Sequence, residues 1–162
     1  MSYHEKRALS GIITVLLMAA GYCLYTFGTY ASGSVGRDDL KFWVAAELIF
    51  IAAGAIVTAA TQILLSLNEY AQQNKTSPRR ISALQKIKEV TAEDEMDHLI
   101  ALKTAKISYA FTGFGFIAGL VTVLTGCSAS VMVNILFFSV CAGSLAEGAA
   151  VFYYYKVGVT NA

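Results

Sequence analysis

The chain has 162 residues, of which 56% are hydrophobic and only 14% are charged, and its net charge is +1. A soluble globular domain carries about 25% charged residues, so this composition excludes an ordinary soluble protein. The apolar residues are also concentrated in long runs that are almost free of charge. The composition and its pattern therefore indicate an integral membrane protein.

The first two apolar runs each predict one membrane-spanning helix. Residues 8–30 contain no charged side chain, and residues 42–67 contain only Glu47. A helix needs about 20 apolar residues to cross a bilayer, and both runs are longer than that. A glycine- and serine-rich loop separates them, which predicts a hairpin.

The third apolar run predicts a second hairpin. Residues 107–155 contain only Glu147, and the run is about twice as long as one span requires. The sequence Gly126-Cys-Ser-Ala-Ser130 near its middle is typical of a turn. We therefore expect four spans in a single domain, residues 1–162. They lie at about 8–30, 42–67, 105–125 and 130–155.

The positions of Lys and Arg predict the orientation of these spans. Positive residues near span ends mark the cytoplasmic side of a membrane. Of the twelve in this chain, only Arg37 and Lys41 lie on one side, and the others flank the termini and segment 68–104. The predicted fold is therefore an all-α polytopic protein of the plasma membrane. Both termini and segment 68–104 are expected to be cytoplasmic, and the third span is expected to extend into the cytoplasm.

Three tyrosines, Tyr22, Tyr25 and Tyr30, lie toward the outer end of the first span. Tyrosine is enriched at membrane interfaces, so we interpret all three as interfacial anchors. A cage of aromatic rings around a ligand is the alternative interpretation. The three cysteines, Cys23, Cys127 and Cys141, have no metal-ligand spacing and are expected to be free thiols.

A polar stripe recurs at helical spacing along the second span: Glu47, Gly54, Thr58, and Thr61 or Gln62. Small and hydroxylated residues allow helices to approach closely, so this stripe is predicted to face protein rather than lipid. Glu47 itself lies about one helical turn inside the outer interface. We expect it to reach water or to pair with Lys41 or Arg37. A role at an ion entrance is the alternative.

The acidic residues of segment 68–104 gather at Glu93, Asp94, Glu95 and Asp97. The spacing of Thr91 and Asp94 resembles a capping box, which predicts a helix that begins at Ala92 and continues into the third span. Before it, a hydrophobic residue at every third position predicts a separate short amphipathic helix over residues 81–90. That helix packs on the inner leaflet or on the protein itself.

The same cluster contains the one candidate metal site of the sequence. Asp94 and His98 are four residues apart on a helix and could converge on a divalent cation. No second His or Cys cluster completes such a site. Acidic residues at a helix start are also common because they offset the helix dipole. We therefore predict no metal and no other cofactor, and keep Glu93, Asp94, Asp97 and His98 as candidate functional residues.

Small residues predict close packing between the third and fourth spans. Gly115 and Gly119 are four residues apart on the third span, and Ser139, Gly143 and Glu147 share one face of the fourth. Such spacing places small side chains one above another on a helix, where two backbones can approach each other. We expect a tightly packed helical bundle.

Glu147 is an ionisable residue inside a predicted span, where a charge is costly and commonly functional. By helix rise it lies within about two turns of the inner boundary. At that depth Lys106 or Lys156 could reach it and form a structural ion pair. A role in transport or proton coupling is the second interpretation, and the sequence leaves both open.

No set of nucleophile and base, phosphate-binding loop or nucleic-acid-binding pattern occurs in the chain, so we predict neither an enzyme nor a nucleic-acid-binding protein. The leading hypothesis is a regulatory or sensing membrane protein that acts through its cytoplasmic segment and helix packing. It would lie in the lipid bilayer as a homo-oligomer or with a cytoplasmic protein partner. The alternative is a small homo-oligomeric transporter or channel, coupled to protons or ions through Glu147.

Several segments together resemble an uncharacterised family of small four-span membrane proteins of Gram-positive bacteria. They are residues 1–7, 39–43, 93–97, 99–103, 131–137, 143–148 and 153–155. The resemblance implies a bacterial protein that is often encoded beside a small helix-turn-helix regulator, and it implies no activity. Two positions depart from the family pattern. Ser128-Ala-Ser130 replaces a Pro-Pro turn, and Val151 replaces a glutamine.

Overall fold

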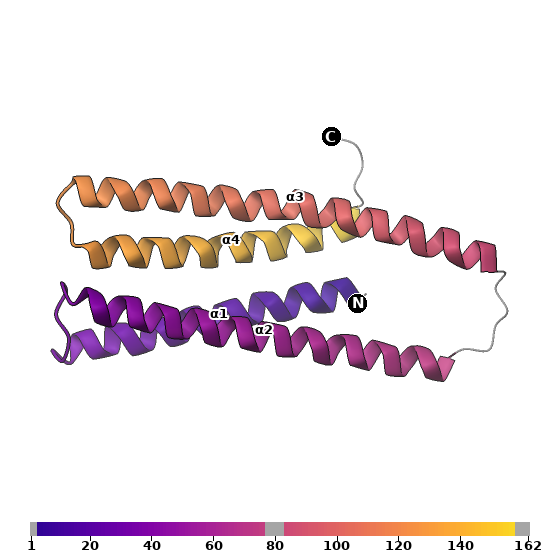
Figure 1. Cartoon of the computed structure of the whole chain (residues 1–162), viewed down its shortest axis with the longest axis horizontal. Coiled ribbons are helices and arrows are strands. Elements are labelled where there is room, and N and C mark those ends of the chain that lie inside the picture. The colour runs from indigo at the N-terminus through magenta and orange to yellow at the C-terminus, as the bar shows by residue number, and fades with distance from the viewer. Residues whose placement is uncertain (1–2, 77–82, 158–162) are drawn as a thin grey trace.

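The computed structural model consists of four long α-helices in two hairpins (Figure 1). It describes residues 3–76 and 83–157, with side chains described at 6–65, 67 and 95–156. Each helix contains a segment long and apolar enough to cross a membrane, which confirms the predicted all-α class with four candidate spans. The helices are α1 (Tyr3–Ala31), α2 (Leu40–Thr76), α3 (Ala83–Leu124) and α4 (Ala129–Val157).

The two short loops lie at one end of the molecule, which we call the loop end, and the two termini lie toward the other, the terminal end (Figure 1). Gly33 and Gly126, with φ of 75° and 79°, lie in these loops, where glycine adopts a conformation that other residues rarely adopt. Helix α4 contacts the other three helices, whereas among the described residues α3 contacts only α4. Helix α2 diverges from α4 toward the terminal end, whereas α1 stays close to α4 there, since a Cβ on Gly148 would lie 2.6 Å from Ile12.

Close packing of α3 on α4 confirms the prediction made from their small residues. A Cβ atom placed on Gly115 would lie 1.8 Å from the Ser139 Oγ atom. A Cβ on Gly143 would lie 2.9 Å from the backbone oxygen of Ser108. Only glycine allows the two backbones to approach this closely, because any side chain there would overlap its neighbour.

The buried core is small and lies between α1, α2 and α4. It contains Tyr22, Ala46 and Phe137, with Phe50 and Cys141 packed against it. Large apolar side chains instead cover the outer faces of the helices, with exposures such as 79% for Leu24 and 86% for Leu124. Such surfaces suit a hydrocarbon environment, because lipid tails are as apolar as the side chains they meet.

The polar segment 68–104 differs from its prediction. Helix α2 continues to Thr76, and α3 is already helical at Ala83, so no helix begins at Ala92. The residues around Thr91 include neither glycine nor proline, so backbone hydrogen bonds continue through a sequence that also fits a cap. A capping residue marks the start of a helix only where the residues before it are not helical. Pro78 and the start of the predicted helix at 81–90 lie outside the described residues.

Candidate functional site

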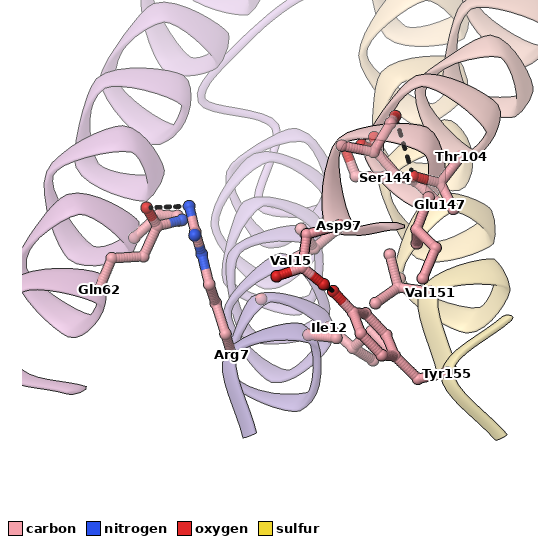
Figure 2. A pocket seen from close by; sticks show the side chains of 16 residues that line it. Arg7, Ile12, Val15, Gln62, Asp97, Thr104, Ser144, Glu147, Val151 and Tyr155 are labelled. Atoms are coloured by element: carbon pink, nitrogen blue, oxygen red, sulfur yellow. Dashed lines mark hydrogen bonds between the residues drawn. The ribbon is translucent and has the colours of Figure 1, made fainter. Parts of the chain in front are cut away.

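A cavity of about 590 Å³ lies between the two hairpins toward the terminal end, and we call it the terminal cavity (Figure 2). All four helices contribute to its wall. Figure 2 shows Arg7 and Gln62 on one side and Asp97, Glu147 and Tyr155 on the other. The wall therefore combines two carboxylates, one guanidinium and several neutral polar groups.

Two hydrogen bonds between side chains in the wall of the terminal cavity link neighbouring helices. Arg7 donates from Nη2 to the Gln62 Oε1 atom at 3.0 Å, which joins α1 to α2. The Tyr155 hydroxyl donates to the Asp97 carboxylate, which joins α4 to α3. Each bond lies within one hairpin. The polar rim therefore strengthens the hairpins individually (Figure 2).

Glu147 is half-buried on α4 and lines the terminal cavity. Among the described residues, no hydrogen bond or ion pair holds its carboxylate, and the ion pair with Lys106 or Lys156 is not formed. Those two lysines are exposed at the surfaces of α3 and α4. Glu147 lines the cavity next to Gly148, where a Cβ atom would lie 2.6 Å from Ile12 on α1. Its carboxylate is thus placed to interact with whatever enters the cavity.

A second cavity, of about 360 Å³, lies between α1, α2 and α4, and we call it the Glu47 cavity. It shares Val15, Thr58 and Ser144 with the wall of the terminal cavity. The two cavities therefore adjoin each other along the helix axes. Together they extend from the terminal end to the buried carboxylate of Glu47.

Glu47 is buried, with 8% of its surface exposed, and it does not pair with Arg37 or Lys41, which are exposed. The prediction of a snorkelling or paired Glu47 is therefore wrong. The polar stripe of α2 faces α1 and α4, as predicted for the stripe as a whole, and this turns Glu47 inward. A Cβ atom placed on Gly54 of the same stripe would lie 3.4 Å from the Met18 Cγ atom on α1.

The only hydrogen-bond donor near the Glu47 carboxylate in the described chain is the Tyr22 hydroxyl, 3.5 Å from Oε1. A phenol has one proton, and Tyr22 donates it at 2.9 Å to the Oδ1 atom of Asn134. A distance of 3.5 Å is at the limit of a hydrogen bond. The carboxylate therefore lies beside the phenol without a strong donor of its own.

Tyr22 is fully buried, so its interpretation as an interfacial anchor is wrong. Its ring centroid lies 4.3 Å from that of Phe137 and 5.8 Å from that of Phe50. Tyr25 and Tyr30 remain exposed near the loop end. The sequence does not show which of the three tyrosines is buried, because an aromatic residue near the end of a span is suited both to a membrane interface and to a protein core.

The acidic cluster of α3 is divided by the helix. Asp97 faces the terminal cavity, whereas Glu95 and His98 are exposed. The side chains of Glu93 and Asp94 lie outside the described residues. Within the described part of the chain, no group of three or more His, Cys, Asp or Glu side chains could hold a metal ion.

Sequence reasoning missed Asn134, Arg7 and Tyr155 as contributors to these cavities. Asn134 carries the most usable signal, since it is the one side-chain amide in the fourth span. It also accepts the Tyr22 bond and donates from Nδ2 to the Ser130 backbone oxygen at 2.8 Å. The cavities thus bring together groups from separate helices.

Chemically, the arrangement offers three carboxylates: Asp97 and Glu147 line the terminal cavity, and Glu47 lines the adjoining one. Carboxylates in such positions can take up and release a proton or a cation. A comparison with known proteins found no matching family model, no matching curated protein and no matching solved structure. The resemblance to a family of small four-span membrane proteins therefore remains a prediction.

Proposed function

We propose that the protein is a small membrane transporter or channel coupled to protons or other cations, with Glu147 as the group that binds and releases the coupled ion. One observation carries this proposal. Glu147 and Glu47 line two adjoining cavities between the hairpins, and no Lys or Arg pairs with either carboxylate in the described chain. A charge kept inside a membrane helix bundle without a structural partner is typical of an ion pathway.

The barrier of this pathway is the buried hydrogen bond between Tyr22 and Asn134. On one side of it lies the Glu47 cavity. On the other side, Asn134 lines a third cavity of about 370 Å³ near the loop end, together with Arg37 and Trp43. Cavities on both sides of a narrow polar contact are what alternating access requires, because either side can open while the other stays closed.

The packing of the helices supports a motion of this kind. Helix α3 packs on α4 alone in the described chain, and the hydrogen bonds at the rim stay within each hairpin. We propose that the two hairpins rock against each other along the α1–α4 and α2–α4 contacts. Rigid-body rocking of one helical unit against another is a common mechanism of secondary transport.

Ion flux into proteoliposomes that contain the purified protein tests the proposal. A pH-sensitive dye inside the vesicles reports proton movement under an imposed potential. We expect flux above that of protein-free vesicles, and we expect Glu147→Gln to reduce it to the protein-free level, since an amide cannot release a proton. Glu95→Gln is the matched control, because Glu95 is exposed on α3 and should leave the flux unchanged.

Two results would reject parts of this proposal. Wild-type protein that conducts neither protons nor alkali cations rejects transport altogether. Flux that is unchanged in Glu147→Gln removes this residue from the pathway and leaves Glu47 as the coupling group. Thermal melts and gel filtration of each variant in detergent show whether it has the wild-type fold before the flux is interpreted.

The regulatory or sensing role is the second candidate, and the unbroken helix α3 favours it. This helix of 42 residues runs from the polar segment into the bundle without a hinge. A partner bound near Glu95 could move the bundle through a rigid helix. Neutralising Glu93, Asp94, Glu95 and Asp97 together should then abolish the recovery of protein partners from membranes. Recovery of the same partners at the same yield rejects this candidate.

A further inference from the structure

We infer that the Glu47 cavity binds a small hydrophobic organic cation, such as a quaternary ammonium or phosphonium ion. This deepens the proposed function by naming a class of substrate, and it rests on that function only for the step of transport. Binding itself follows from the cavity. Its three components are a buried carboxylate, aromatic rings beside it and an apolar wall of suitable size.

The carboxylate supplies the charge. Glu47 is 8% exposed, borders the cavity and has a hydrogen-bond donor only at 3.5 Å in the described chain. A buried carboxylate that lacks strong donors is costly unless a cation neutralises it or it takes up a proton. A cationic ligand therefore gains a charge partner in a site of low dielectric, where the attraction is strong.

The aromatic rings supply a second attraction for a cation. Phe50 and Phe137 line the cavity, and both pack against Tyr22, whose hydroxyl lies next to Glu47. The face of an aromatic ring is electrically negative and attracts ammonium groups, most strongly when they are desolvated. Of the three tyrosines considered above as a ligand cage, Tyr22 is the buried one. The two rings that line this cavity, Phe50 and Phe137, come from two other helices.

The rest of the wall selects an organic rather than an inorganic cation. Met18, Ile51, Leu136 and Val140 surround the cavity, and its polar groups other than Glu47 are few. Calcium takes six to eight oxygen ligands and magnesium needs six, which this wall does not provide. Its volume of about 360 Å³ lies in the range of small-molecule sites, about 300–1,000 Å³.

A neutral acyl chain from the bilayer is the competing occupant. It would fill the apolar wall equally well, but it would leave the Glu47 carboxylate without a partner. The two occupants differ in charge, so a charged and a neutral probe of related shape separate them. Tetraphenylphosphonium is a permanent hydrophobic cation, and triphenylphosphine is a neutral molecule of related shape.

Equilibrium dialysis of radiolabelled tetraphenylphosphonium against the full-length protein in detergent, corrected for empty micelles, measures this binding. We expect saturable binding that triphenylphosphine does not displace. Glu47→Gln should weaken it by more than about tenfold, since a buried charge pair loses one partner. Glu47→Asp, which keeps the charge, should retain saturable binding, and Phe50→Leu should weaken it several-fold.

Chemical modification of the wild-type protein provides a second test, which does not depend on the folding of a variant. Dicyclohexylcarbodiimide modifies carboxyl groups in apolar surroundings, and mass spectrometry of the wild-type protein locates the modified residue. Tetraphenylphosphonium should protect Glu47 from this reagent, whereas triphenylphosphine should not. Equal protection by both probes, or unchanged affinity in a folded Glu47→Gln variant, overturns the inference and leaves an apolar slot for lipid.

The outcomes separate this inference from the proposed function. Saturable binding that depends on Glu47, in a protein that shows no flux, rejects transport and leaves the binding site. Flux that depends on Glu147, in a protein that does not bind the cation, rejects only the inference. Glu95→Gln is expected to bind tetraphenylphosphonium like the wild type, because Glu95 is exposed on α3 and lines neither cavity.

Discussion

At the scale of single residues, the face on which a side chain lies decides what it does. Glu47 and Tyr22 lie on buried faces of α2 and α1, where they meet each other and Asn134. Tyr25 lies only three residues from Tyr22 and is 53% exposed. The same residue type therefore serves a buried polar contact in one position and the surface in another.

Gly115 and Gly113 provide a matched pair of substitutions on α3. Gly115→Ala should destabilise the protein by about 1–3 kcal/mol, because its Cβ would overlap Ser139 in a closely packed interface. Gly113→Ala should be neutral or stabilising, since a Cβ there meets nothing within 4 Å and alanine favours helix. Thermal unfolding in detergent measures both.

The double variant Gly115→Ala, Ser139→Gly tests the cause of that loss. Removing the Ser139 side chain removes the atoms that the new Cβ would overlap, so part of the lost stability should return. If Gly115→Ala unfolds at the same temperature as Gly113→Ala, then α3 and α4 do not pack as closely as described here.

At the scale of elements, α3 shows how a helix can continue through a sequence that fits a cap. Its 42 residues combine a polar first part with an apolar second part, and the change between them does not interrupt the helix. Interior positions of a helix also accept threonine and acidic residues, since every backbone group there is already paired. A sequence that fits a cap therefore allows a helix to begin at that point but does not require it.

Ala92→Pro distinguishes a continuous α3 from a helix that begins at this residue. Proline is favoured at the first position of a helix, but inside one it costs about 3 kcal/mol and bends the chain. Spin labels at positions 85 and 99 would be separated by about 21 Å along a straight helix. We expect one narrow distance distribution in the wild type and a broad, shifted one in Ala92→Pro. Identical distributions in the two proteins contradict the continuous helix.

At the scale of the whole molecule, the terminal cavity lies where α2 diverges from α4 while α1 stays packed against α4 (Figure 1). The short loops connect the helices within each hairpin, and α1 and α2 contact the other hairpin through α4. Toward the terminal end, polar side chains from all four helices face one space. We propose that this end faces the cytoplasm, as the positions of Lys and Arg predict.

Cysteine labelling tests this orientation. Cys127 is an exposed free thiol in the turn at the loop end. A membrane-impermeant maleimide added to intact cells should therefore label the wild type but not Cys127→Ser. In the Cys127→Ser background, Lys156→Cys places a thiol at the terminal end and should react only after permeabilisation. The reverse pattern would place the termini outside.

The sequence by itself determined the fold class, the four candidate spans and the small-residue contact between α3 and α4. These features depend on apolar length and on local helical spacing, which a linear chain displays directly. It also identified Glu47 and Glu147 as unusual, because a charge in an apolar run needs no structure to be recognised.

Only the tertiary structure decided what these carboxylates face. The neighbour of Glu47 is Tyr22 on α1, which itself donates to Asn134 on α4, 112 residues away in the sequence. The surroundings of Glu147 likewise depend on how all four helices are placed around the terminal cavity. Rotation of each helix about its axis, and the angle between hairpins, are set by packing over many residues. That is why the adjoining cavities could not be predicted from the positions of charges along the chain.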